Sequence, residues 1–424
     1  MAHSKSEDTR PATCTLVLIG LLIFFILAGK SPDAISNPQL WAEDGTVFFA
    51  QQFGHALPQV FTTYAGYLHL IPRLIAWIAT AFSYNTEPLI YNFAALCIDS
   101  AAILYFAQRS QLLAPTWLTI AAFALTPTNG EIFGTLTNIQ WFLQFALFAA
   151  ALYPRPIEPV RHRLFYLATA AMALTGPFSI FLTLIVAGVF VLAEINRRIT
   201  IRTLSIFSTW WTQLDKSVLG IVAVSALIQL IVIGFIGSRI PTGPFSLSVA
   251  KHLVLSGFQM HTFGVILMKE SVALIVFFAL LWAVVRSAWQ ANAMVWPIML
   301  AMLAFGLAQI VSSAHMSPNA HLAYTTFDSD RYFTFAKIAF WICLAAALRY
   351  SQAWNHSAPL ILAPLLVLFA ICHPQNLRRP SLPDLHWKQA VQALKHPSIA
   401  RQVTIPINPA PWSITVKPQQ AIEK

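Results

Sequence analysis

Apolar runs recur along most of the chain, and each has close to the length of a bilayer-spanning helix. The first run is "CTLVLIGLLIFFILAG" (14–29). A helix needs about 20 predominantly apolar residues to cross the hydrocarbon core. The other expected spans are 88–107, 113–127, 136–152, 162–176, 178–194, 217–236, 271–287, 293–313, 334–349 and 357–373.

The composition supports the same interpretation. Of the 424 residues, 57% are apolar and only 10% are charged, whereas soluble domains carry roughly 25% charged residues. The pattern predicts an all-α fold, a polytopic transmembrane helical bundle. No small-x-small cleavage site follows the first run, so we expect a retained signal anchor. The net charge of +10 comes without the basic and aromatic interleaving of a nucleic-acid interface, so no nucleic-acid partner is expected.

Short loops, most of them rich in arginine, orient the later spans. Positively charged loops stay in the cytoplasm. The four loops are 153–163, 196–202, 286–292 and 349–357, and they fall on one side if the spans alternate. With the N-terminus also inside, the chain has about 11 spans and its C-terminus outside.

The segment Gly66–Ser83, "GYLHLIPRLIAWIATAFS", is a special case. The alternation of spans leaves no room for it to cross, and it carries His69, Pro72 and Arg73 within a short apolar stretch. We therefore expect it to lie in the outer interface, as amphipathic helices do. The first extracytoplasmic loop, 30–87, then contains interfacial helices. A full crossing would raise the count to about 12 spans.

The chain divides by composition into a transmembrane part, 1–373, and a polar, proline-rich tail, 374–424. The tail is too short to build a large core of its own. We expect it to form a small cap on the extracytoplasmic side. No internal repeat appears, although many transporters contain one.

Polar residues collect in the predicted outer loops. Glu43 and Asp44 stand side by side soon after the first span. Two later segments carry more candidates: Glu131, Asn138, Gln140 and Trp141 in "TPTNGEIFGTLTNIQW" (126–141), and Arg331 and Tyr332 in "AYTTFDSDRYF" (323–333). Charges at membrane depth are costly and usually functional. Their convergence on one face predicts a single site there.

Each candidate also has an ordinary structural explanation. Asp44 precedes an apolar stretch, as a helix N-cap does. Arg73 fits a side chain that reaches lipid headgroups, and His69 fits a satisfied interfacial histidine. The residues at span ends are explained as caps, belt residues or a local ion pair: Asn138, Gln140, Trp141, and Asp330 with Arg331.

Several kinds of chemistry lack their motifs. The chain has no Walker loop, H-E-x-x-H, G-x-S-x-G or Cys-x-x-Cys, so nucleotide hydrolysis and zinc chemistry are unsupported. No metal-ligand set is identified. A divalent cation, Mg or Mn, is the one candidate cofactor.

The layout resembles the GT-C superfamily of integral membrane glycosyltransferases. The matching segments are "WAEDG" after the first span, "GYLHLIPR", "TNIQW", "DRYF" and the terminal "PINPAPW". The resemblance implies a polyprenyl-phosphate-linked sugar as donor and an acidic motif in the first outer loop. More narrowly, it looks like uncharacterised bacterial membrane proteins of this type, which implies a multi-pass protein of the inner membrane with an active site facing the periplasm or exterior.

The resemblance also implies roles for the candidates. Asp44 is the expected general base, with Glu43 assisting it or contacting a metal. Arg73 and Arg331 are the expected phosphate ligands, because guanidinium binds phosphate in a bidentate manner. The other expected substrate-binding residues are Trp41, His69, Glu131, Asn138, Gln140, Trp141 and Tyr332. The acceptor is then a cell-envelope glycan or lipid.

Two other classes stay open. A transporter or flippase of lipid-linked sugars or other envelope lipids would bind its substrate with the same charges and move it unreacted. A membrane acyltransferase would need a reactive histidine, for which His69, His261, His315 and His321 are available. Both classes share the membrane location of the glycosyltransferase, so composition does not separate the three.

Overall fold

The computed structural model describes residues 13–154, 162–236, 244–263, 294–315, 329–350, 367, 377–395 and 402–417. This part of the chain is mostly helical, as the apolar runs predict. Six of its helices are long and apolar enough to cross a membrane: Thr13–Lys30, Glu87–Leu112, Phe178–Ile199, Lys216–Ile236, Val295–Ser312 and Asp330–Tyr350. The expected spans 271–287 and 357–373 lie outside the described residues, apart from residue 367.

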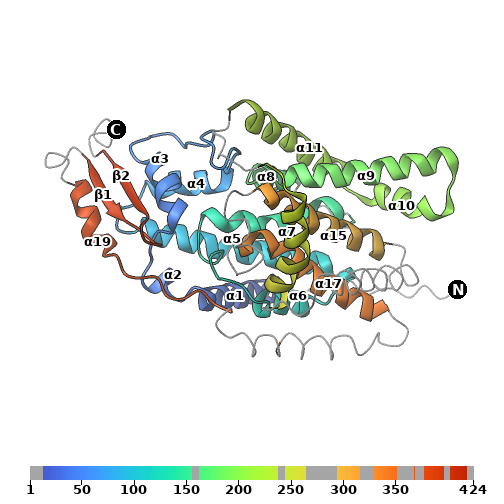
Figure 1. Ribbon diagram of the computed structural model, residues 1–424, viewed down its shortest axis with the longest axis horizontal. Coiled ribbons are helices and arrows are strands. Elements are labelled where there is room, and N and C mark those ends of the chain that lie inside the picture. The colour runs from blue at the N-terminus through green and yellow to red at the C-terminus, as the bar shows by residue number, and fades with distance from the viewer. Residues whose placement is uncertain are drawn as a thin grey trace.

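The bundle is organised around α7 (Gln140–Leu152), every residue of which is buried. A helix that is apolar on all sides belongs in the interior of a bundle. α5 (Glu87–Arg109) packs on one side of α7, and α17 (Thr334–Tyr350) also contacts it. Phe145 of α7 stacks on Phe335 of α17 with 4.6 Å between ring centroids. Figure 1 shows α7 crossing the middle of the molecule.

Two other helix pairs complete this central part. α1 (Thr13–Lys30) lies along α5, and α15 (Val295–Ser312) lies along α17. The second pair approaches closely because Gly306 has no side chain. A Cβ atom at Gly306 would lie 2.9 Å from Ala336 Cα. Small residues allow transmembrane helices this close approach.

α9 (Phe178–Ile199) and α11 (Lys216–Ile231) pack together and extend toward one end of the molecule (Figure 1). Between them α10 (Ser205–Gln213) folds back on α9, a helix that the apolar pattern does not predict. The indole N–H of Trp210 donates to the Leu152 carbonyl at 2.9 Å. α10 therefore anchors this end to α7.

Three predicted spans form helices that are shorter than expected. α6 covers Thr116–Leu125, η3 and α7 cover Thr137–Leu152, and α8 covers His162–Ala173. The predicted interfacial segment forms α4 (Leu70–Ala79), a helix of 10 residues. At 1.5 Å per residue it rises about 15 Å, roughly half of the hydrocarbon thickness. α4 is too short to cross a bilayer by itself.

Further short elements lie between the long helices. The loop after α1, which the sequence analysis expects to face outward and which we keep calling the first outer loop, folds into α2 (Asp33–Ser36), a π-helix η1 (Asp44–Phe49) and α3 (Ala50–Gln52). A second set, which the apolar pattern does not predict, is α12 (Leu247–His252), η6 (Leu253–Gly257) and α13 (Phe258–Phe263). η8 (Asp330–Phe333) precedes α17.

The tail forms a small unit at the same end as the first outer loop. α19 (Trp387–Ala390) and η10 (Val391–Lys395) precede two antiparallel strands, β1 (Val403–Pro406) and β2 (Ser413–Val416). Figure 1 shows α19 and both strands beside α2, α3 and α4. The tail therefore covers the first outer loop, and we call these strands with their connection the C-terminal hairpin.

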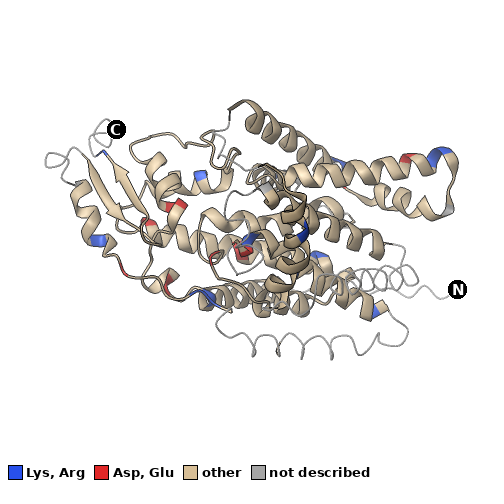
Figure 2. Cartoon of the chain, in the orientation of Figure 1, with Lys and Arg blue, Asp and Glu red and all other residues tan. Residues whose placement is uncertain are grey.

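Close contacts hold the C-terminal hairpin in place. A Cβ atom at Gly45 would meet Ile407 and Ile414, so only glycine fits under the strands. Asn408 donates its backbone N–H to the Leu40 carbonyl at 3.2 Å. Arg379 forms a buried ion pair with Asp33 at 2.9 Å. Figure 2 shows that charged residues are few elsewhere on the bundle.

Candidate functional site

Asp44 is a fully buried structural anchor. Its two carboxylate oxygens accept the backbone N–H groups of Leu136 at 2.9 Å and Thr137 at 2.7 Å. These N–H groups open η3 and α7, where an acceptor from outside the helix replaces the missing intrahelical one. Burial raises the pKa of the Asp44 carboxyl to about 7, and the two N–H donors oppose that shift. Asp44, the expected general base, therefore links the first outer loop to the segment that precedes α7.

Glu43 faces a different environment from its neighbour. Its Oε1 accepts the hydroxyl of Tyr64 at 2.7 Å, and its side chain is only partly buried. The backbone turns sharply just before it, because Ala42 has a φ of +24°. A π-helix follows, and such segments are frequent at functional sites. Of the two acids, Glu43 is the one that a ligand can reach.

Glu131 and Arg331 bring two further outer segments to Glu43. Arg331 Nη1 lies 3.4 Å from Glu131 Oε2, and both side chains stay partly accessible. Burial raises the pKa of Glu131, while Arg331 lowers it and Asp330 and Glu43 raise it further. Glu43 also acts electrostatically on Arg331. Glu131 therefore contacts the guanidinium of Arg331, and Glu43 lies in the same neighbourhood.

Aromatic rings and unpartnered polar atoms border this charge cluster. The rings of Trp141 and Tyr332 lie 5.2 Å apart, edge to face. Buried polar atoms that make no hydrogen bond among the described residues include Glu131 Oε1, Asn138 Oδ1, Gln140 Oε1 and Trp141 Nε1. Native structures leave few such atoms without a partner. Their concentration here indicates a place for a polar ligand or water.

His69 and Arg73 form a neighbouring layer rather than part of the charge cluster. His69 is fully buried against Tyr67, with ring centroids 4.7 Å apart. Burial, and then the nearby Arg73, lower the pKa of His69 to about 3. Arg73 donates to the Val47 carbonyl at 3.3 Å and to Gln51 Oε1 at 2.6 Å. Its guanidinium is buried among protein groups and does not meet Arg331.

Trp41 lies against the C-terminal hairpin, where its backbone bridges to that of Asn408. The structure thus brings together seven of the sequence candidates: Glu43, Glu131, Asn138, Gln140, Trp141, Arg331 and Tyr332. We call this set the outer cluster. Asp44 supports this set by binding the backbone at the start of η3 and α7. Trp41, and His69 with Arg73, pack beside it.

The sequence analysis misses two contributors. Tyr64 and Tyr67 exchange backbone hydrogen bonds, which present the Tyr64 hydroxyl to Glu43. The helical periodicity of the segment 66–83 does not predict this contact, because the two tyrosines lie before α4 rather than on it. Their only sequence signal is the run of aromatic residues before His69.

The second missed feature is a buried charge network. Lys337 Nζ contacts both oxygens of Asp330 at 2.7 Å and donates to the Pro127 carbonyl at 2.8 Å. His261 Nδ1 and the Thr128 hydroxyl also bind the Asp330 carboxylate, each at 2.8 Å. The expected local ion pair of Asp330 with Arg331 is not the contact formed. Asp330 holds η8 from within the bundle, and Arg331 projects to the outer cluster.

Among the described residues, no group of three or more His, Cys, Asp or Glu side chains has the arrangement of a metal site. Comparisons with protein-family models, with curated proteins and with solved structures gave no match. What the structure defines by itself is a helical, membrane-embedded protein with a polar cluster at the end covered by the C-terminal hairpin.

Proposed function

We propose that this protein is a membrane glycosyltransferase that moves a sugar from a polyprenyl-phosphate donor to a cell-envelope glycan or lipid. The observation that carries the proposal is the outer cluster itself. Glu43 and Glu131 converge on Arg331, beside two aromatic rings and several unpartnered polar atoms. Sugars suit such a site because they stack on rings and need many hydrogen bonds.

Glu43 is the general base of the proposed reaction. It takes the proton of the acceptor hydroxyl, whose oxygen bonds to the anomeric carbon of the donor sugar. The bond between that carbon and the phosphate oxygen breaks, and the phosphate leaves with the electron pair. Arg331 stabilises the departing phosphate. Glu43 replaces Asp44 in this role because both Asp44 oxygens already accept backbone N–H groups.

Trp141 and Tyr332 provide the faces against which the sugar lies. Gln140 and Asn138 supply amide groups with unpartnered oxygens for sugar hydroxyls. A divalent cation, Mg or Mn, would have Glu43 and Glu131 as its acidic ligands. No step of the proposed reaction depends on that cation.

The proposed topology has about 11 spans, the N-terminus in the cytoplasm and the outer cluster facing the periplasm or exterior of a bacterial inner membrane. Arg197 and Arg198 support it, because they lie in the last turn of α9. α9 starts beside the turn that contacts Leu68 of the first outer loop. The basic end and the loop therefore lie at opposite ends of one long helix.

The experiment is sugar transfer by purified protein in proteoliposomes. Radiolabelled polyprenyl-phosphate hexoses are the donors, and extracted envelope glycans and lipids are the acceptors. We expect transfer by the wild type, its loss in Glu43→Gln, and full retention in Glu194→Gln. Glu194 is a matched control because it pairs with Arg197 and Arg198 at the far end of α9. No transfer from any donor, or equal transfer by Glu43→Gln, would contradict the proposal.

A transporter or flippase is the second candidate, and the buried network of Asp330 and Lys337 favours it. Ionisable residues inside a membrane bundle often mark a transport pathway. The same proteoliposomes distinguish the two, since a flippase moves a fluorescent lipid-linked sugar between leaflets without forming product. An acyltransferase receives less support, because His69 is buried among rings.

A further inference from the structure

One face of α7 carries polar side chains from the outer cluster into the bundle. Gln140, Trp141 and Gln144 are three or four residues apart, so they lie on one side of the helix. Each has a buried polar atom without a hydrogen-bond partner among the described residues, namely Gln140 Oε1, Trp141 Nε1 and Gln144 Oε1. The amide N–H of Gln144 donates to the Trp141 carbonyl at 3.1 Å. The polar lining therefore continues one helical turn beyond Gln140.

The start of α9 packs against this face. The rings of Trp141 and Phe178 lie 5.2 Å apart, edge to face. Gly176, just before α9, comes so close that a Cβ atom there would lie 2.6 Å from Gln140 Oε1. Ser179 is fully buried, and its hydroxyl makes no hydrogen bond among the described residues. α9 thus adds an unpartnered hydroxyl in the turn that contacts Trp141.

These polar atoms lower the stability of the protein while they lack a partner. A buried polar group without a hydrogen bond costs free energy that an apolar side chain of similar size does not. Sequences depart from such rules mainly at functional sites. Gln144 and Ser179 therefore indicate a ligand rather than a structural role.

We infer that Gln144 and Ser179 bind the exocyclic hydroxyl of a hexose, so that the donor sugar is a hexose in which this hydroxyl is free. The inference rests on the sugar donor of the proposed function. Trp141 holds the pyranose ring, and Gln144 lies four residues after Gln140, a rise of about 6 Å along the helix. The exocyclic hydroxyl stands on a carbon outside the ring, so it reaches farther than the ring hydroxyls. It donates to Gln144 Oε1 and accepts from the Ser179 hydroxyl.

The same two groups disfavour related sugars. A pentose, or a deoxyhexose with an exocyclic methyl group, leaves Gln144 and Ser179 without a partner. A hexuronic acid brings a carboxylate to an amide and a hydroxyl, neither of which carries a positive charge to balance it. A site that hydrogen-bonds a substrate hydroxyl discriminates well against analogues without it. Gln144 and Ser179 are thus specificity residues, separate from the acid and the guanidinium of the proposed reaction.

The test measures donor binding by the full-length protein in nanodiscs, with Glu43→Gln as the parent so that no donor is consumed. Synthetic polyprenyl-phosphate glucose, mannose and galactose are each compared with the analogue that lacks the exocyclic hydroxyl. We expect the best-bound hexose to bind about 10–100-fold more tightly than its analogue, because two hydrogen bonds are lost. Ser179→Ala and Gln144→Leu should each lower this ratio by about threefold to tenfold, by weakening hexose binding alone.

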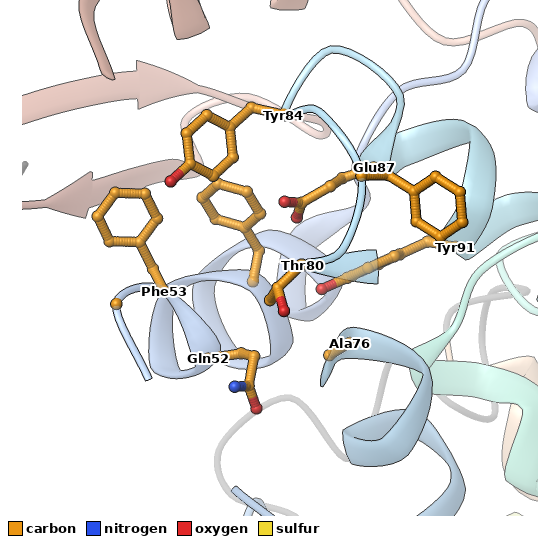
Figure 3. Close-up of a pocket in the computed structure, with 10 residues that line it drawn as sticks. Gln52, Phe53, Ala76, Thr80, Tyr84, Glu87 and Tyr91 are labelled. Atoms are coloured by element: carbon orange, nitrogen blue, oxygen red, sulfur yellow. The ribbon is translucent and has the colours of Figure 1, made fainter. Parts of the chain in front are cut away.

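Thr80→Val is the matched control. The Thr80 hydroxyl donates to the Trp77 carbonyl at 2.7 Å, and Thr80 lines a separate cavity between α3, α4 and the start of α5 (Figure 3). This variant should keep the full ratio. Without donor, Ser179→Ala should melt at or above the temperature of its parent, because it removes an unpartnered buried hydroxyl. A clear fall in melting temperature would assign Ser179 a structural role and overturn the inference.

The inference is also overturned if no hexose binds, if every hexose and its analogue bind equally, or if the folded variants keep the ratio of the parent. Should Gln144→Leu fail to fold, Ser179→Ala alone decides. Equal binding, together with sugar transfer by the wild type, would overturn this inference and not the proposed transferase. A hexose preference in binding without transfer by the wild type would support the inference and contradict the transferase.

Discussion

Lys337 and Asp330 form a buried ion pair two helical turns apart, with the lysine ammonium 2.7 Å from each carboxylate oxygen. The side chains are 3% and 0% exposed. Removal of one partner from a buried pair leaves an uncompensated charge. The pair therefore determines how η8 enters α17, and with it where Arg331 lies.

Lys337→Met should lower the free energy of unfolding by about 3–5 kcal/mol. The double variant Lys337→Met with Asp330→Asn should lower it less, because it leaves no lone carboxylate in the bundle. Chemical denaturation in detergent measures both. Equal stability of the single variant and the wild type would show that the pair is not formed.

Asp44→Ala should also destabilise the protein, by about 2–5 kcal/mol, because it leaves two buried N–H groups without an acceptor. Asp44→Asn keeps one acceptor oxygen, so its loss of stability should be about half of that in Asp44→Ala. The same denaturation assay tests this. A wild-type midpoint for Asp44→Ala would remove the anchoring role and return Asp44 to the list of catalytic candidates.

Glu43→Gln, unlike the Asp44 variants, should lose activity and keep its stability. Its turnover should fall by about 10²–10⁴-fold, the usual contribution of a general base, while its melting temperature stays close to that of the wild type. Tyr64→Phe removes the hydroxyl that orients Glu43 and should reduce turnover by a smaller factor. Transfer kinetics in proteoliposomes, paired with melting curves, give both quantities. A loss of stability that matches the loss of activity would contradict a catalytic role.

His69 should give stability a dependence on acid pH. Its pKa is about 3 when folded and 6.5 when unfolded, so the unfolded state binds the proton more readily. The stabilisation from a neutral His69 is complete above about pH 6.5 and is lost as the pH falls toward 3, by up to about 1.4 kcal/mol per unit. His69→Phe should remove this slope between pH 6.5 and 5. Replacement of the exposed His55 by Phe is the control, and an unchanged slope in His69→Phe would refute the assignment.

The proposed topology predicts which single cysteines a membrane-impermeant reagent labels in a cysteine-free background. Cysteines at Leu57 and Thr404 should be labelled from the periplasmic side, and cysteines at Gln111 and Arg198 only after the membrane is opened. All four positions are exposed. Gly45 and Gly130 are unsuitable, since a Cβ atom there would meet Ile407 or the Arg379 backbone. Labelling of Leu57 and Gln111 from one side would overturn the topology.

The apolar pattern predicts the long helices well because it records burial in lipid and bundle directly. The expected spans 14–29 and 293–313 correspond to Thr13–Lys30 and Val295–Ser312. The apolar pattern does not predict helices that contain many polar residues, such as α10. It also does not predict strands in which buried and exposed residues alternate over only four positions. β1 alternates buried and exposed positions, but a four-residue alternation within a proline-rich tail is too short to distinguish from chance.

The sequence predicts which loops carry the candidate site, but it does not predict the role of each residue in it. The sequence places Glu43, Glu131 and Arg331 in three outer loops, and the structure brings them together. It cannot separate Glu43 from Asp44, because the partners of Asp44 are backbone N–H groups of a distant segment. The sequence analysis does not single out Lys337, which lies within an apolar run. Its seven-residue spacing from Asp330 nevertheless places both residues on one helix face.

The packing of the C-terminal hairpin on Gly45 has a consequence for biosynthesis. Chains are made from the N-terminus onward, so the loop bearing Glu43 is complete hundreds of residues before Ile407 and Ile414 exist. Until then this loop lacks the apolar cover that Gly45 accommodates. The last strands to leave the ribosome thus complete the surroundings of Glu43, and a partly made chain lacks part of the candidate site.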